Sequence, residues 1–304
     1  MPVTLEGKLV VAISSRALFD LSASHAIFER SGLEAYRHYQ IDHENEPLEP
    51  GTAFPLIRRL LELRYPDSGD PVAEVILFSK NDVDTGLRVL NSIEHYQLPI
   101  TRAVFTQGAS PFPYLEPFGV DLFLSADGQD VRAALNRGRA SAMIYTGWSA
   151  PPFSTLEEIR IAFDGDAVLF SDEAEQVYQT GGLQAFQDHE RDKAHLPLQP
   201  GPFQPFLSVL HRIQRLYAER QQKPPIRTAL VTARSAPAHK RVIHTLRHWG
   251  ITVDEAFFLG GLPKAPVLAR WQPHIFFDDQ QSHCEPAAQV VPTAQVLSGV
   301  TNQL

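Results

Sequence analysis

Short apolar runs separated by more polar stretches set the pattern of this 304-residue chain. Each run has three to five residues and is followed by turn-type residues, which is typical of buried strands in a parallel sheet. The runs are 10–13, 75–78, 103–105 and 121–124 in the first half, and 160–163, 229–231, 255–259 and 274–277 in the second half. Helical patterns lie between them, as at 237–249, where Ser235 is the expected N-cap and Gly250 follows the end. The alternation predicts an α/β fold, a parallel sheet with helices on both faces.

The chain also contains an internal repeat. The sequence of 32–36 is echoed 150 positions later at 182–186, and that of 47–51 at 197–201. Farther along, the displacement is 153, and the 36 positions from 88 to 123 share nine identities with 241–276, where average residue usage gives about two. A tandem duplication explains this pattern. We therefore expect a pair of Rossmann-like units at 1–148 and 149–304, each with a helical cap-like insertion, which in the second unit lies at about 173–226.

Composition narrows the classes of partner. Apolar residues make up 43% of the chain and charged residues 20%, which excludes a disordered protein. The formal charge of -8 and the absence of a dense Lys/Arg run argue against a nucleic acid polymer, and no apolar run is long enough to cross a membrane. The single cysteine and an N-terminal sequence without a leader pattern favour the cytoplasm. A homo-oligomer stays open.

The second copy carries reactive side chains where its strands end. In open parallel sheets, ligands bind at the carboxyl ends of the strands. The positions there are Asp164 and Asp166, then Thr232, Ala233 and Arg234, then Lys264, then Asp278 and Asp279. The corresponding positions of the first copy are Ser14 and Arg16, Ser79, Pro111, Ser125 and Ala126. Each motif alone is more often a turn or a helix cap, but the complete set in chain order favours chemistry in the second copy and a non-catalytic role for the first.

This set resembles the motifs of the haloacid dehalogenase superfamily of aspartate-nucleophile phosphohydrolases. Longer stretches resemble the cytosolic 5'-nucleotidase type I family, namely 162–173, 230–235, 254–259 and 273–280, together with 43–47 and 108–111 in the first copy. The resemblance covers essentially residues 8–285. It implies hydrolysis of nucleoside 5'-monophosphates to nucleoside and phosphate with magnesium. Two positions depart from the superfamily pattern: Val168 stands where many members have Thr, and the acid that often follows Asp278 is missing, with His283 nearby.

The residues fit that chemistry. Phosphate monoesters hydrolyse very slowly unaided, so an enzyme must supply a positioned nucleophile, charge neutralisation and a proton for the leaving oxygen. We expect Asp164 to attack phosphorus and form an aspartyl-phosphate that water then cleaves. Asp166 is the expected general acid and base, and Lys264 is expected to neutralise charge on the phosphoryl group.

Two further groups of residues complete the expected site. Thr232, Ala233 and Arg234, with the amides that open the following helix, are expected to hold phosphate oxygens. The expected Mg²⁺ ligands are hard oxygen donors: Asp164, Asp166 through its carbonyl, Asp278 and, directly or through a second contact, Asp279.

Alternatives remain at this point. The motifs fix the reaction and not the leaving group, so a phosphatase or phosphotransferase acting on another small phosphomonoester is a second reading. A nucleotide-sensing module with little turnover is a third. The first copy could be a lid, a dimer-like partner or an effector site, and Lys80 and Asn81 stand where an anion could bind. In the second copy, His189, Glu190, Lys193 and His195 are candidates for contacts to base or ribose, and Phe186, Phe203 and Phe206 for stacking on a base.

Overall fold

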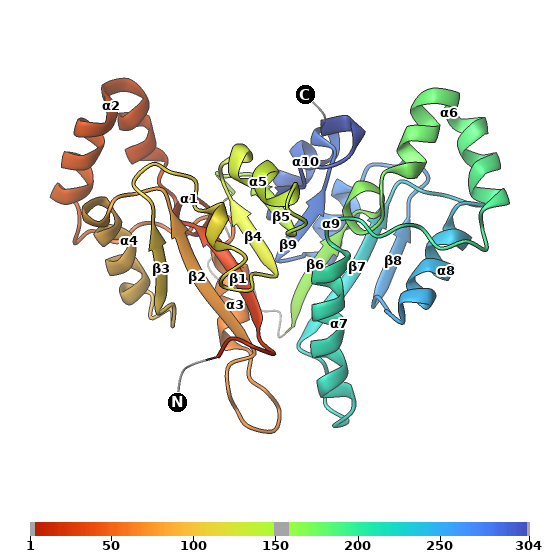
Figure 1. The fold of residues 1–304 in the computed structure, drawn as a ribbon, viewed down its shortest axis with the longest axis horizontal. Helices are drawn as coiled ribbons and strands as arrows, with labels where there is room; N and C mark the ends of the chain where they lie inside the picture. Colours follow the sequence, from red (N-terminus) through yellow and green to blue (C-terminus); the bar gives the residue numbers. More distant parts are fainter. Residues whose placement is uncertain (1–3, 149–157, 303–304) are drawn as a thin grey trace. The chain divides into compact units, whose positions relative to one another are not determined.

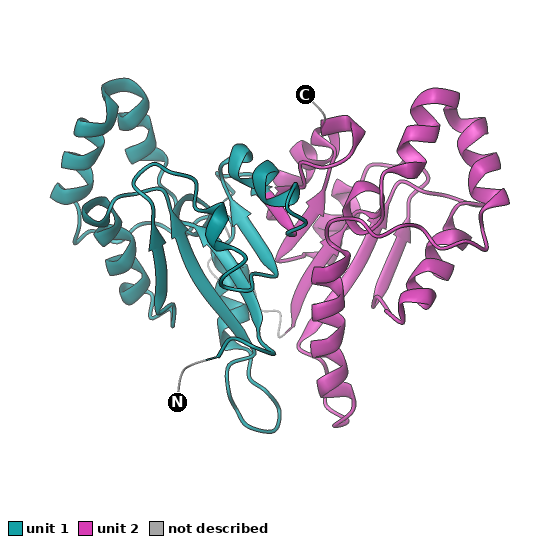
Figure 2. Cartoon of the chain, viewed as in Figure 1, with its two compact units in different colours: residues 1–139, 143–155 teal, residues 140–142, 156–304 magenta. Residues whose placement is uncertain are grey.

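The computed structural model describes residues 4–148 and 158–302, and their contacts divide the chain into two compact units (Figure 2). Unit 1 comprises 1–139 and 143–155, and unit 2 comprises 140–142 and 156–304. The boundary expected from the sequence, between 148 and 149, borders a segment, 149–157, that lies outside the described residues.

Unit 1 is built on strands in the spatial order β3-β2-β1-β4, and β5, the next strand in the order, has residues in both units (Figure 1). Strand β1 pairs in parallel with both β2 and β4, and β2 pairs in parallel with β3. The strands are β1 (Leu9–Ser14), β2 (Ala73–Ser79), β3 (Arg102–Phe105), β4 (Leu122–Ser125) and β5 (Ser141–Ile144). The α-helices are α1 (Ser15–Leu18), α2 (Ser22–Asp42), α3 (Phe54–Glu62), α4 (Val83–His95) and α5 (Gly128–Leu135).

Unit 2 repeats this order as β10-β9-β6-β7-β8. Strand β6 pairs in parallel with β7 and β9, and β10 pairs in parallel with β9. The strands are β6 (Ile159–Phe163), β7 (Ile226–Thr232), β8 (Glu255–Phe258), β9 (Ile275–Asp278) and β10 (Thr293–Gln295). The α-helices are α6 (Glu173–Asp192), α7 (Gln204–Ala218), α8 (His239–Trp249), α9 (Ala265–Trp271) and α10 (Gln281–Ala288).

The predicted α/β class with parallel strands and helices is confirmed, and the four strands expected in each copy are present. Strands β5 and β10 were not placed from the sequence. The expected N-cap at Ser235 is wrong: α8 begins at His239 after Ala238, and no side chain caps it. Its end is as expected, with Gly250 in the left-handed conformation at φ 67°.

The sheet of unit 2 is packed on both faces. Successive strand residues point to opposite faces, so Ala162 and Phe276 join the cluster formed with Leu268 and Trp271 of α9. Their neighbours Phe163 and Phe277 face the other way and pack with Phe203 and Phe206, beside or within α7. Burying a phenylalanine side chain contributes about 1.5–3 kcal/mol. A sheet clamped in this way fixes the residues that follow its strands.

Each unit has one sharply bent helical arm. Helix α2 bends at Gly32 (φ 80°) and α6 bends at Gly182 (φ 71°), a conformation that glycine adopts at little cost. Both arms are seen in Figure 1 as paired segments that project away from the strands of their own unit. In unit 2 the arm is α6 alone, because the apolar face of α7 is buried against the sheet.

Candidate active site

The turn after β6 presents the first two acids. Asp164 follows the last residue of the strand, and its backbone N–H donates to the carbonyl of Phe277 at 2.8 Å. A π-type turn over Gly165–Leu169 comes next, and Ala167 within it has φ 57°. A Cβ at Gly165 would lie 3.4 Å from the Thr232 hydroxyl, so this turn packs against the end of β7. The Asp164 side chain is thereby buried at the edge of the sheet.

Lys264 joins two carboxylates. Its Nζ lies 2.8 Å from Asp164 Oδ1 and 2.6 Å from Asp278 Oδ2, and all three residues are buried. Asp278 ends β9, and its Oδ1 accepts from the backbone N–H of Gln280 at 2.9 Å and lies 3.3 Å from His283 Nδ1. Candidate ligand atoms of Asp164, Asp278 and His283 lie within 4.8 Å of one another, and no other such group occurs in 4–148 and 158–302. The candidate nucleophile Asp164 therefore lies next to a lysine and to two further candidate metal ligands, Asp278 and His283.

Burial and mutual charge shift the pKa values of these groups. Burial, reinforced by the Asp278 charge, raises the pKa of Asp164 to about 7, despite the opposing effect of Lys264. Burial also raises the pKa of Asp279 to about 9, and the charges of Asp164 and Asp278 add to the effect. Burial alone would raise the pKa of Asp278, but Lys264 and His283 outweigh it and lower the pKa. Burial opposes the charge of Lys264, yet the two carboxylates prevail and raise its pKa. Strong shifts of this kind concentrate at functional sites.

Asp166 belongs to a second cluster, which reaches the bent arm. The Arg234 guanidinium holds the Asp166 carboxylate with two hydrogen bonds, from Nε at 2.8 Å and from NH2 at 2.6 Å. Its NH1 donates to Glu190 of α6, a fully buried residue. Glu190 accepts a second hydrogen bond, from Arg241 NH1 at 2.8 Å, and Arg241 NH2 donates to Glu173 at 3.1 Å. The network fixes Asp166 relative to the first turns of both α6 and α8.

The remaining predicted site residues, Thr232, Ala233 and Asp279, have different surroundings. Thr232 is buried, and its hydroxyl accepts from the backbone N–H of Arg234 at 3.2 Å, while Ala233 is exposed. Asp279 accepts from the Thr301 hydroxyl at 3.0 Å, and its Oδ1 is buried with no hydrogen-bond partner in the described part of the chain. Asp164, Lys264 and Asp278 are brought together; Asp279 and the Asp166 carboxylate lie outside the group that could hold a metal ion.

Several side chains have roles that the sequence did not indicate. His283 was noted only as a neighbour of the last motif, and its place in the first turn of α10 puts it beside Asp278. Glu190 was a candidate for contacting a base or ribose, but each of its two carboxylate oxygens forms an ion pair with an arginine, Arg234 or Arg241. Lys193 and His189 both pair with Glu173. Phe203 and Phe206 are core residues, whereas the Phe186 ring lies under Arg234, 5.6 Å from its guanidinium carbon. The sequence feature that could have pointed to Glu190 is its match with Gln40 in the first copy, another hydrogen-bonding residue at the same place in the repeat.

The fold and these acids define an α/β phosphohydrolase-like site at the ends of parallel strands. The chain belongs to the 5'-nucleotidase family, because the model of that family, described as 5'-nucleotidase, matches residues 1–303. It is 40% identical over 298 residues to human cytosolic 5'-nucleotidase 1B, an alignment that covers 95% of this chain and 48% of that protein. The chain thus spans about half the length of this curated relative. No solved structure matches it.

Among the described residues, none of the helices is both long enough and apolar enough to cross a membrane.

Proposed function

We propose that this chain hydrolyses nucleoside 5'-monophosphates to nucleoside and phosphate in the cytosol, through a covalent phosphoryl intermediate on Asp164. The observation that carries the proposal is the contact of one buried lysine with two buried carboxylates at the ends of β6 and β9. Family membership and the name of the human relative support the nucleotide as substrate and the cytosol as location.

In the first step, a carboxylate oxygen of Asp164 attacks phosphorus, and the bond from phosphorus to the 5'-oxygen breaks. Lys264 balances the negative charge that gathers between Asp164 and the phosphoryl oxygens. Asp166 donates a proton to the leaving 5'-oxygen, and in the second step it removes a proton from the water that attacks the aspartyl-phosphate. The Asp166–Arg234 ion pair has to open or rearrange for these transfers, so Arg234 becomes available to phosphoryl oxygens as Asp166 turns to the substrate. Thr232 and the exposed backbone at Ala233 are the other phosphate contacts that we propose.

The donor set fits a divalent cation. Asp164 and Asp278 supply carboxylate oxygens, which suit Mg²⁺, and the two residues stand in the group whose ligand atoms lie within 4.8 Å. We propose that these two carboxylates and the carbonyl of Asp166 hold the ion, with Asp279 supporting the site from beyond this group. Bound there, the ion would favour the ionised form of Asp164 and neutralise phosphoryl charge.

The test is phosphate release from a panel of nucleoside monophosphates and sugar phosphates, with and without Mg²⁺, by the wild type and by Asp164→Asn. We expect release from nucleoside monophosphates and a loss of at least about 10³-fold in Asp164→Asn, since a nucleophile is removed while its shape is kept. The matched control is Asp188→Asn on the exposed face of α6, which should keep full activity. Faster release from sugar phosphates, or substantial activity in Asp164→Asn, would reject the substrate class or the nucleophile, respectively.

A further inference from the structure

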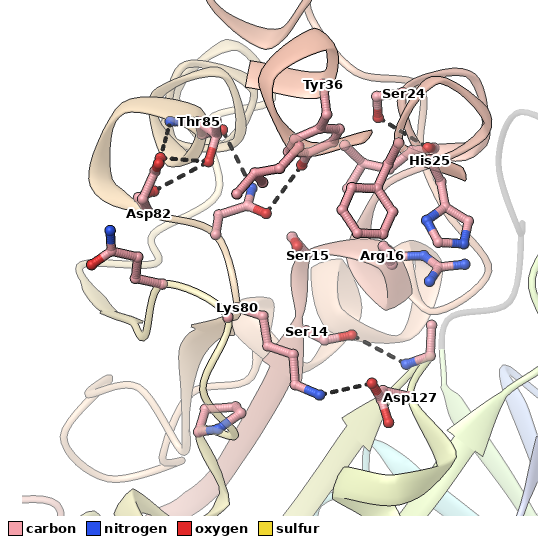
Figure 3. Close-up of a pocket in the computed structure, with 18 of the residues that line it drawn as sticks. Ser14, Ser15, Arg16, Ser24, His25, Tyr36, Lys80, Asp82, Thr85 and Asp127 are labelled. Carbon is pink, nitrogen blue, oxygen red and sulfur yellow. Dashed lines mark hydrogen bonds and ion pairs between the residues drawn. The ribbon is translucent and has the colours of Figure 1, made fainter. Parts of the chain in front are cut away.

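Unit 1 contains a pocket of about 540 Å³ that lies entirely within that unit (Figure 3). Its floor is the ends of β1, β2 and β4, and its wall is the bent arm α2. It occupies in unit 1 the position that the candidate active site occupies in unit 2, because both lie at the carboxyl ends of matching strands. The residues that line it can therefore be compared position by position with those of unit 2.

The pocket lacks the groups needed for hydrolysis. Ser14 stands at the position of the nucleophile Asp164, and Ser125 stands at the position of Asp278. Both carboxylates of the candidate metal group are thus replaced by serine. The lining also contains four acids, of which Asp127 and Asp130 pair with Lys80, whose Nζ lies 2.7 Å and 2.9 Å from them. A ligand here would meet no carboxylate at the position of the proposed nucleophile, and the described residues of unit 1 contain no group of three candidate metal ligands.

Hydrogen-bond donors line this pocket near the positions that the acids occupy in unit 2. Arg16 is half-buried in the pocket wall, and its guanidinium makes no hydrogen bond or ion pair with any residue of the described ranges. The Ser14 oxygen accepts from the backbone N–H of Ala17 at 3.3 Å and from that of Ala126 at 3.2 Å. A hydroxyl that only accepts still has its proton to donate. An unpaired guanidinium and a free O–H donor thus line the same pocket, next to the strand end that matches Asp164 of unit 2, and together they suit the oxygens of an anion.

Aromatic side chains form another part of the lining. Phe28 on α2 is 44% exposed and lines the pocket, stacked on His25 and edge-on to Tyr36. Tyr36 is itself fixed by a hydrogen bond from its hydroxyl to Asn81 at 3.0 Å. An exposed ring held by two neighbours offers a rigid face for a flat apolar group. Figure 3 shows Arg16 and His25 on the same side of the pocket, with Tyr36 above them.

We propose that unit 1 binds a phosphomonoester that carries an aromatic ring, with the phosphoryl group on Arg16 and Ser14 and the ring against Phe28, without a divalent cation and without cleaving it. The site is independent of the activity proposed for unit 2. Arg16 suits the phosphoryl group because its planar fork can donate two parallel hydrogen bonds to one anion. The volume accommodates a ligand of nucleotide size, within the range usual for small-molecule sites.

The experiment is calorimetric titration of the full chain with AMP in EDTA, which removes divalent cations from unit 2. We expect one AMP to bind and to be recovered intact. Arg16→Gln should weaken this binding at least tenfold and Phe28→Ala severalfold, whereas Asp164→Asn should leave it unchanged. Arg30→Gln, on the exposed face of the same helix arm as Phe28, is the matched control and should bind like the wild type.

Absence of binding in EDTA would overturn the proposal, as would binding that Asp164→Asn removes and Arg16→Gln preserves, because the ligand would then sit in unit 2. Inorganic phosphate and adenosine serve as partial probes, and each should bind at least tenfold more weakly than AMP. Phosphate that binds as tightly as AMP would refute the role of the aromatic wall. Since Mg²⁺-dependent phosphate release is measured separately, failure here leaves the proposed function of unit 2 standing.

Discussion

The two units have the same order of parallel strands, but they differ in the side chains at the ends of those strands. In unit 2, Glu190 of the arm binds Arg234 and Arg241. In unit 1, the matching Gln40 accepts from Arg88 NH1 at 3.1 Å and donates to the Tyr36 hydroxyl, which in turn donates to Asn81. Ion pairs between Glu190 and two arginines therefore occupy in unit 2 the places where, in unit 1, a single arginine and uncharged groups are hydrogen-bonded.

The turns after the first strands differ in length. Gly51 donates its N–H to the carbonyl of Leu18, and Gly201 makes the same hydrogen bond to Leu169, so these pairs are displaced by 150 and 151 positions. The turn of unit 2 thus has one more residue than that of unit 1, and the extra residue lies in the segment that carries Asp166. Arg16 and Asp166 are at matching positions when residues are counted onward from the first strand of each unit. The backbone around them differs because the turn in unit 2 has the extra residue. The strands thus keep the same order in both units, while the segments that follow them differ in charge and in length.

The largest effect that we expect in this comparison is at Lys264, whose counterpart in unit 1 is Pro111. Lys264→Met should lower kcat by about 10²–10³-fold, because it removes the cation that contacts Asp164, the proposed nucleophile. Initial rates with a nucleoside monophosphate measure this, with Lys240→Met on the exposed side of α8 as the control. Unchanged rates in Lys264→Met would mean that the lysine only holds the fold.

A smaller effect is expected at Glu190. Glu190→Gln copies the residue of unit 1, leaves two buried arginines with one carboxylate fewer, and should lower the free energy of unfolding by about 3–5 kcal/mol. Because Arg234 then holds Asp166 less firmly, we expect kcat to fall about tenfold with little change in KM. Urea unfolding and steady-state kinetics measure the two effects.

The reciprocal change, Gln40→Glu in unit 1, is the matched control for Glu190 and should leave kcat within about twofold of the wild type, since no Asp166 counterpart is attached to that network. A kcat unaffected by Glu190→Gln, with only stability reduced, would assign Glu190 to folding alone.

The smallest effect concerns Glu173, at the start of the arm in unit 2, where unit 1 has no acid. Burial would raise its pKa, but Lys193 and Arg241 outweigh burial and lower it from 4.5 to about 2. A lowered carboxyl pKa stabilises the fold above about pH 5, and the contribution is lost as the pH falls toward 2. The urea midpoint of Glu173→Gln should therefore lie below that of the wild type at pH 7, and the two should converge by pH 2–3.

Glu175→Gln, which loses only a contact with Gln179, serves as the control for Glu173 and should match the wild type at both pH values. A gap that stays constant from pH 7 to pH 3 would show that ionisation of Glu173 is not what stabilises the arm.

The sequence predicted candidate site residues best where they lie directly next to the buried residues of a strand or at the start of a helix. Asp164, Lys264 and Asp278 could be found because each follows a buried strand or opens the helix behind it, and parallel strands bring such ends together. Strands β5 and β10 were missed because Ser141–Ile144 and Thr293–Gln295 are short and mix small or polar residues with apolar ones.

Contacts between helices could not be read from the chain. Glu190 meets Arg234 only because α6 bends back at Gly182, and the angle of that bend has no local signature. His283 reaches Asp278 because α10 begins directly after the strand-end turn, so that its first turn faces the site. In the same way, Ser235 was expected as the N-cap because its side chain suits that position, but the N-cap of α8 lies three residues later, at Ala238.

The central claim is that Asp164 becomes covalently phosphorylated, and it is tested most directly by trapping the intermediate. The wild-type protein is mixed with excess nucleoside monophosphate and Mg²⁺, quenched in acid during turnover, digested and analysed by mass spectrometry. We expect a phosphoryl group on the peptide that contains Asp164, assigned to that residue and absent from Asp164→Asn. Steady turnover with an unmodified Asp164, or with the phosphoryl group on another side chain, would contradict it.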